Sequence, residues 1–143
     1  MKWPMVKLGN VVSVNPRLPK DTDELQEVTF VAMASASEDG LLIDADKRVL
    51  SETKKGFTYF ERGDVLLAKI TPCFENGKCL RAGQISTDIG FGSTEFHVLR
   101  ANSEKINPDY LFYLVWNDSF RFYGEKSMSG AAGQKRVGTD FLK

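Results

Sequence analysis

Hydroxyl, amide and cationic side chains gather in three short stretches of the sequence. Groups of these kinds donate hydrogen bonds to phosphates and to the edges of nucleic-acid bases. Taken one at a time, each stretch is explained as well by turns and solvated surface. The candidate contact residues are Lys69, Thr71, Asn76 and Lys78 in GDVLLAKITPCFENGK (63–78), Ser93 and Thr94 in GFGSTEFHVLR (90–100), and Gln134, Lys135 and Arg136 in SMSGAAGQKRV (127–137).

Few residues could support catalysis or hold a metal. His97 is the only histidine, and on a strand it is more often a packed or surface residue than a general base. Five residues separate Cys73 from Cys79, which is not a common zinc spacing. We therefore expect no catalytic residue, no metal site and no bound cofactor. A small enzyme that uses Cys73 or His97 is the third hypothesis for function.

The charges are unevenly distributed although the net charge is zero. Residues 21–52 hold nine acidic residues against Lys47 and Arg48, whereas residues 53–143 hold 13 basic residues against ten acidic ones. A polyanion repels carboxylates, so we expect the acidic segment to face away from any nucleic acid and the C-terminal part to face it. A solvated acidic surface explains the same charges at least as well.

The middle of the chain has strand patterns. Residues 27–33 (EVTFVAM) are rich in β-branched and aromatic residues, and residues 65–70 (VLLAKI) form the nearly continuous apolar run of a strand covered on both faces. Pro72 excludes a longer central strand. The Asn76-Gly77 pair predicts a hairpin turn, from which residues 79–83 return as the partner strand.

A third strand pattern occupies residues 93–101 (STEFHVLRA). Its alternation places Phe96 and Val98 on one face and Glu95 and His97 on the other. The glycines in IGFGS (89–93) indicate a tight or left-handed backbone before this strand.

Helical periodicity appears after residue 106. Asn107 is a predicted N-cap with Pro108 at the first helical position, and a second helix is predicted from Ser119 to about Lys126. The first helix has an apolar stripe of Leu111, Leu114 and Val115 that Phe112 and Trp116 widen. The expected fold class is α+β (mixed α/β), a single domain with a twisted, largely antiparallel sheet and C-terminal helices.

The length of 143 residues suggests one domain, and 42% hydrophobic with 27% charged residues is ordinary for a globular protein. No apolar run reaches the roughly 18 residues that span a membrane, and the N-terminus has no signal-peptide pattern. A cytoplasmic protein without membrane contact is therefore expected.

The three stretches, in this order, resemble the target recognition domain of the specificity subunit of type I restriction–modification systems. The opening WPMVKLGNVVSVNP (3–16) resembles the usual start of that family, although Asn10 stands where an acidic residue is common. The resemblance covers essentially the whole chain and is weakest through residues 17–55. It implies that residues 1–143 are one recognition domain, before a long spacer helix expected beyond residue 143.

The resemblance also implies a function and partners. Such a bacterial subunit catalyses nothing: each recognition domain reads one half of a split target in double-stranded DNA. Its partners are a methyltransferase subunit, a restriction subunit, and a second recognition domain or subunit copy. S-adenosylmethionine, ATP and magnesium belong to the partner subunits.

Two further expectations rest on this resemblance. Family members with different targets share the three stretches, so base choice is expected from parts of residues such as 17–60 and 81–90. This expectation conflicts with the acidic charge of residues 21–52, because carboxylates near DNA cost affinity unless one accepts from a cytosine amino group. The alternative is a protein-interaction module that docks the methyltransferase subunit and contacts DNA only in the assembly.

Overall fold

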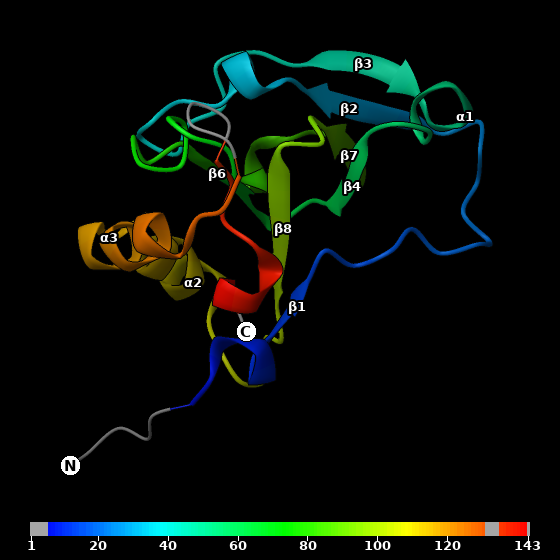
Figure 1. Cartoon of the computed structure of the whole chain (residues 1–143). Helices are drawn as coiled ribbons and strands as arrows, with labels where there is room; N and C mark the ends of the chain where they lie inside the picture. Colours follow the sequence, from blue (N-terminus) through cyan, green and yellow to red (C-terminus); the bar gives the residue numbers. More distant parts are fainter. Residues whose placement is uncertain (1–5, 131–134, 143) are drawn as a thin grey trace.

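The computed structural model describes residues 6–130 and 135–142 of the chain. Two four-stranded sheets and a pair of adjacent helices make up most of the regular secondary structure (Figure 1). The predicted α+β class and largely antiparallel pairing are confirmed. The single predicted sheet is wrong, because the strands divide between two sheets.

The first sheet, called sheet A, has the order β1-β8-β5-β6, and all its neighbours are antiparallel. Its central pair joins β5 and β8, with Ala68 opposite Phe96. The predicted strand 65–70 thus exists, and residues 79–81 return beside it as predicted. The strands are β1 (Val12–Val14), β5 (Val65–Ala68), β6 (Cys79–Arg81) and β8 (Phe96–Ala101).

The second sheet, called sheet B, has the order β3-β2-β7-β4. Its β2–β7 pair is parallel, and its other pairs are antiparallel. The predicted strand 27–33 corresponds to β2. The strands are β2 (Glu27–Val31), β3 (Asp46–Val49), β4 (Thr58–Glu61) and β7 (Ile89–Gly92).

Both predicted helices are present. The Asn107 side chain caps α2 (Pro108–Trp116) by accepting from the Asp109 and Tyr110 amides, and the Asn117 side chain caps α3 (Asp118–Ser127). A capping side chain of this kind stabilises a helix by about 1 kcal/mol. The shorter helices are α1 (Leu50–Thr53) and the 3-10 turns η1 (Leu8–Asn10), η2 (Met33–Ser35), η3 (Ala82–Gln84) and η4 (Thr139–Leu142).

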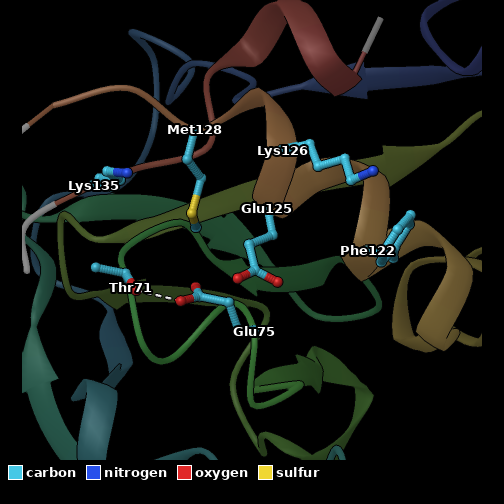
Figure 2. Close-up of a pocket in the computed structure, with 7 residues that line it drawn as sticks. All are labelled: Thr71, Glu75, Phe122, Glu125, Lys126, Met128 and Lys135. Atoms are coloured by element: carbon cyan, nitrogen blue, oxygen red, sulfur yellow. Dashed lines mark hydrogen bonds between the residues drawn. The ribbon is translucent and has the colours of Figure 1, made fainter. Parts of the chain in front are cut away.

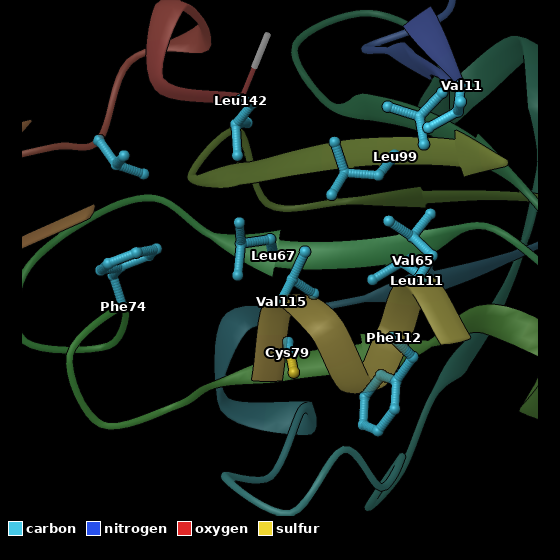
Figure 3. Packing of buried hydrophobic residues seen from close by; sticks show 12 residues of the cluster. Val11, Val65, Leu67, Phe74, Cys79, Leu99, Leu111, Phe112, Val115 and Leu142 are labelled. Carbon is cyan, nitrogen blue, oxygen red and sulfur yellow. The ribbon is translucent and has the colours of Figure 1, made fainter. Parts of the chain in front are cut away.

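Strand β5 is buried on both faces. Val65 and Leu67 pack with Leu111 and Val115 of α2 (Figure 3). On the opposite face, Leu66 and Ala68 pack with residues of sheet B that include Val31 and Phe60. Sheet A is therefore the middle layer between the two long helices and sheet B.

Strand β8 departs from its predicted pattern. It begins at Phe96 rather than Ser93, and its first four residues are all buried. The alternation predicted two different faces, with Phe96 and Val98 on one and Glu95 and His97 on the other. Because β8 is the central neighbour of β5, the same two layers cover both of its faces.

The Asn76-Gly77 pair does not form a two-residue hairpin turn. Residues 69–78 connect β5 to β6, and within them the Gly77 amide donates to the Phe74 carbonyl while the Lys78 amide donates to the Cys73 carbonyl. Gly77 has a φ of 84°, and a Cβ there would lie 2.5 Å from an Arg121 guanidinium nitrogen. The positive φ therefore favours glycine at this position, whereas the Arg121 guanidinium that a Cβ would meet is the far end of a flexible side chain.

The predicted tight or left-handed backbone at IGFGS is also wrong, because residues 89–92 form the extended strand β7. Gly90 is required for packing. A Cβ at this position would lie 2.2 Å from the Phe60 ring.

Replacing Gly90 with alanine is therefore expected to destabilise the protein. Because Phe60 is fully buried and cannot move aside freely, overpacking should lower the free energy of unfolding by about 1–3 kcal/mol. Gly83→Ala is the matched control, since its added Cβ meets no atom within 4 Å, and its effect should stay within about 0.5 kcal/mol. Urea unfolding of both variants measures this, and equal stabilities would contradict the packing role of Gly90.

Candidate nucleic-acid interface

The three polar stretches meet at one end of sheet A, where β5 ends and β8 begins. The Lys69 amide donates to the Glu95 carbonyl at 2.9 Å, and the Val137 amide donates to the Lys69 carbonyl at 2.8 Å. The Thr71 amide donates to the Lys135 carbonyl at 2.8 Å. Residues 69–71 therefore lie between two segments that follow them by about 25 and 65 positions.

An ion pair joins the outer two of these segments. The Arg136 guanidinium donates to both carboxylate oxygens of Glu95, each at 2.8 Å. This pairing lowers the pKa of Glu95 and raises the pKa of Arg136. A bidentate contact of this kind fixes orientation as well as distance. Arg136 thus holds residues 135–137 against the turn before β8, so it has a structural task besides any contact with nucleic acid.

His97 is a buried side chain that connects the same junction to the N-terminal part of the chain. It is 4% exposed, and its Nε2 donates to the Val137 carbonyl at 2.7 Å while its Nδ1 accepts from the Asn15 amide nitrogen at 3.2 Å. This arrangement requires the neutral imidazole, and burial lowers the pKa of His97. Of the two roles expected for His97, a packed or a surface residue, the structure shows the packed one.

Two of the candidate cations remain available at this junction. Lys69 is half-buried and Lys135 is exposed, and in the described part of the chain neither makes an ion pair. Lys78 is half-buried, and its ammonium donates to the Met33 carbonyl at 3.2 Å. The junction therefore presents Lys69 and Lys135 as point charges that a phosphate could reach.

Some of the uncharged candidate side chains already make hydrogen bonds within the protein, and others are exposed. The Thr71 hydroxyl donates to the Glu75 carboxylate, and the Ser93 hydroxyl accepts from the Glu95 amide at 3.1 Å. Thr94 and Asn76 are exposed. Gln134 lies outside the described residues.

A hollow beside the junction contains residues that the sequence did not single out. Its volume is about 520 Å³, and it lies between α3 and the β5–β6 connection (Figure 2). The recurrence of Phe122, Glu125 and Lys126 at helical spacing was the available signal, but spacing alone does not reveal a neighbouring turn. The lining residues are Thr71, Glu75, Phe122, Glu125, Lys126, Met128 and Lys135.

The thiols and carboxylates do not assemble into a metal site in residues 6–130 and 135–142, where no three His, Cys, Asp or Glu side chains cluster suitably. Cys79 is buried, which raises its pKa to about 12 and disfavours a reactive thiolate. Within the same described ranges, no helix is both long and apolar enough to cross a membrane.

Comparisons with known proteins agree with the sequence resemblance. No protein-family model matches the chain. The chain is 38% identical over 143 residues to the specificity subunits of the type I restriction enzymes EcoEI and EcoAI of Escherichia coli. It is 25% identical over 149 residues to that of StySPI of Salmonella potsdam. These alignments cover 99% of this chain and 24%, 24% and 31% of the relatives, so the chain spans about a quarter of the first two.

Solved structures share the fold. The HsdS subunit from Thermoanaerobacter tengcongensis matches with a TM-score of 0.72 at 21% identity, over 96% of this chain and 35% of that one. A chain from a structure on complex assembly and conformational transition of the type I R-M system matches with a TM-score of 0.70, at the same identity and coverage. The predicted resemblance to specificity subunits is confirmed.

The neutral state of His97 predicts a pH dependence of stability. Its pKa is lower in the folded than in the unfolded chain, so the unfolded chain binds more protons just below the ordinary value of about 6.5. The free energy of unfolding should therefore have its full value above about pH 6.5 and decrease as the pH drops from there toward 5.

Urea unfolding of the wild type and His97→Gln across this range measures the effect, since glutamine cannot titrate and should flatten the slope. Glu104→Gln is the control. This exposed carboxylate lies beyond the far end of β8 and does not act on His97, so its replacement should leave the slope between pH 6.5 and 5 unchanged. A slope between pH 6.5 and 5 that survives in His97→Gln would show that another group causes it.

Proposed function

We propose that this chain, a homologue of one part of the type I restriction enzyme specificity subunits, binds double-stranded DNA in a sequence-specific way. In this proposal it reads one half of a bipartite target on behalf of a restriction–modification complex and catalyses no reaction itself. S-adenosylmethionine, ATP and magnesium would serve the partner subunits in the cytoplasm.

The observation that carries the proposal is the junction at the end of β5. Three stretches that are far apart in sequence meet there. Lys69 and Lys135 make no ion pair in the described chain, and the exposed Thr94 directly precedes Glu95, which bonds to Lys69. Ammonium, hydroxyl and amide groups of this kind make most protein contacts to the DNA backbone. The similarity to specificity subunits supports target recognition as the task of the chain.

A division of labour between the sheets follows from the proposal. Phosphate contacts position a protein on DNA, whereas contacts to base edges select the sequence. The junction belongs to sheet A, while residues 17–60 and 81–90 contribute β2, β3, β4 and the start of β7, all in sheet B. Sheet A would thus hold the DNA backbone, and sheet B with its connections would choose bases.

The proposal includes an assembly. A methyltransferase subunit, a restriction subunit reached through the complex, and a second recognition domain or subunit copy would be the partners. The share of the relatives that lies outside this chain, about three quarters of the first two, leaves room for the elements that hold such partners.

A selection from randomised duplexes tests the proposed function. The domain is incubated at low salt with duplexes that carry a randomised core, and the bound fraction is recovered and sequenced over several rounds. We expect enrichment of one short motif. If the domain retains DNA but no motif is enriched, base reading by this chain is contradicted. If the domain retains no DNA and instead binds a methyltransferase subunit in a salt-insensitive way, the protein-interaction alternative is favoured.

The two junction lysines predict a change in salt dependence. Each lysine that neutralises a phosphate adds roughly one unit to the slope of log affinity against log salt. The double substitution Lys69→Ala/Lys135→Ala should therefore reduce this slope by about two units and weaken binding to all sequences alike. Fluorescence anisotropy with a labelled duplex at several salt concentrations measures both effects.

Lys105→Ala is the matched control for the lysine substitutions. Lys105 is exposed but follows the far end of β8, where its ammonium donates to the Asn10 carbonyl. Its replacement should leave the salt slope unchanged. If the control and the double variant have the same slope of log affinity against log salt, the junction is not part of the DNA-binding surface.

A further inference from the structure

Strand β3 carries two cations at the free edge of sheet B. Lys47 and Arg48 are the only basic residues between positions 21 and 52, and in the described part of the chain β3 pairs with β2 alone. Figure 1 shows β3 as the outermost strand of this sheet. The antiparallel β2–β3 pair is therefore a two-stranded ribbon at an edge, and the major groove of DNA is wide enough to admit such a ribbon.

The Arg48 guanidinium stacks on the face of this ribbon that points away from sheet A. Phe30 packs with the separate cluster on that face, whereas its neighbour Val31 packs toward sheet A. Arg48 lies 3.8 Å from the centre of the Phe30 ring and 5.9 Å from that of Phe57, and the two rings meet edge to face. A guanidinium is weakly hydrated and stacks favourably on aromatic rings. These rings therefore orient the donors of Arg48 before any ligand binds.

Arg48 also differs from the other arginines in having free donors. It lies 3.6 Å from the Asp46 carboxylate, too far for a hydrogen bond, and the Asp46 side chain is 74% exposed. An exposed ion pair of this kind holds its members only weakly. Arg17 is exposed, and no ring contact orients it in the described part of the chain. The other five arginines all donate hydrogen bonds to carboxylates: Arg62, Arg81, Arg100, Arg121 and Arg136.

The ribbon carries no net charge, although it belongs to the acidic part of the sequence. Its ionisable residues are two acids, Glu27 and Asp46, and two cations, Lys47 and Arg48. The other acidic residues of positions 21–52 lie outside β2 and β3. The charge of this segment therefore does not keep DNA away from the ribbon itself.

The ribbon adjoins the junction at the end of β5. The Ser93 amide donates to the Val31 carbonyl at the end of β2 at 3.2 Å, and Ser93 directly follows β7, which flanks β2 on the side opposite β3. Since neighbouring strands lie about 4.8 Å apart, β3 is roughly 10 Å from β7, which is less than the ~12 Å width of a major groove. The junction and the ribbon are thus close enough to contact one duplex, the first through its backbone and the second through base edges.

We propose that Arg48 reads a guanine base through the major groove, an inference that rests on the proposed function and names a residue that selects sequence. Arginine donates two parallel hydrogen bonds to O6 and N7 of guanine, and this contact requires the fixed guanidinium plane that a phosphate contact does not need. Asp46, two positions away on the same face of β3, would accept from the amino group of the paired cytosine. The two side chains together match the major-groove edge of a G·C pair.

Parallel selections with the whole chain test the inference. Wild type, Arg48→Ala and Arg48→Lys are each incubated with duplexes that carry a randomised core, and the bound fractions are sequenced. We expect the wild-type motif to contain one guanine that neither variant selects, while the other positions stay unchanged. Lysine keeps the charge but lacks the paired planar donors, so it should not restore the preference.

Fluorescence anisotropy then measures the size of the effect. The labelled probes are the selected duplex and three duplexes that carry the other base pairs at the guanine position. The wild type should prefer guanine there by about tenfold, as one bidentate contact provides, and both Arg48 variants by less than about twofold.

Arg81→Ala is the matched control. Arg81 also lies over aromatic rings, those of Phe112 and Tyr113, but it donates to Asp109 of α2, so its replacement should leave the motif unchanged. A wild type that enriches no motif would contradict the proposed function and this inference together. A wild-type motif that both Arg48 variants select with equal strength would overturn the inference alone. Weaker binding of Arg48→Ala to all sequences alike, with a salt slope lower by about one unit, would show a phosphate contact and would overturn guanine reading.

Discussion

Burial of β5 on both faces is the constraint on which the rest of the structure depends. Val65 and Leu67 pack toward the helices, and Leu66 and Ala68 pack toward sheet B. Four consecutive side chains of one strand therefore contact both of the layers that cover sheet A. A strand buried in this way must pair on both edges, since an unpaired buried backbone group costs as much as a lost hydrogen bond. Strands β8 and β6 supply these pairs. Their connections consequently emerge at the same end of sheet A.

The candidate site is a result of this pairing. Once β5 ends at Ala68, the backbone of residues 69–71 no longer has strand neighbours and bonds instead to Glu95, Lys135 and Val137. His97 then links this junction to the N-terminal part of the chain through Asn15. The proposed DNA surface and the hollow beside it therefore share one foundation, and a change in the β5–β6 connection should affect both. The two features overlap, because Thr71 and Lys135 belong to the junction and also line the hollow.

Local signals were sufficient for several elements. The cap formed by Asn107 with Pro108 located the start of α2, and the apolar run of 65–70 identified a strand covered on both faces. The sequence predictions were wrong for elements whose environment depends on residues that are distant in sequence but close in space. Gly90 lies in an ordinary extended strand, and glycine is needed there because the Phe60 ring, from the neighbouring strand β4, occupies the space that a Cβ would take. Likewise, the alternation around His97 did not reveal that both faces of β8 would be covered.

By itself, the sequence determined the class of the fold, the identity of the central strand, the helix starts and the three stretches that resemble specificity subunits. These features depend on neighbouring residues along the chain, such as caps, turns and continuous apolar runs. Only the tertiary structure decided that the strands form two sheets, that Glu95 engages Arg136, and that Glu75 faces α3 across a hollow. The reason is physical: each of these depends on contacts between residues tens of positions apart, and no local pattern specifies which distant partner a side chain will meet.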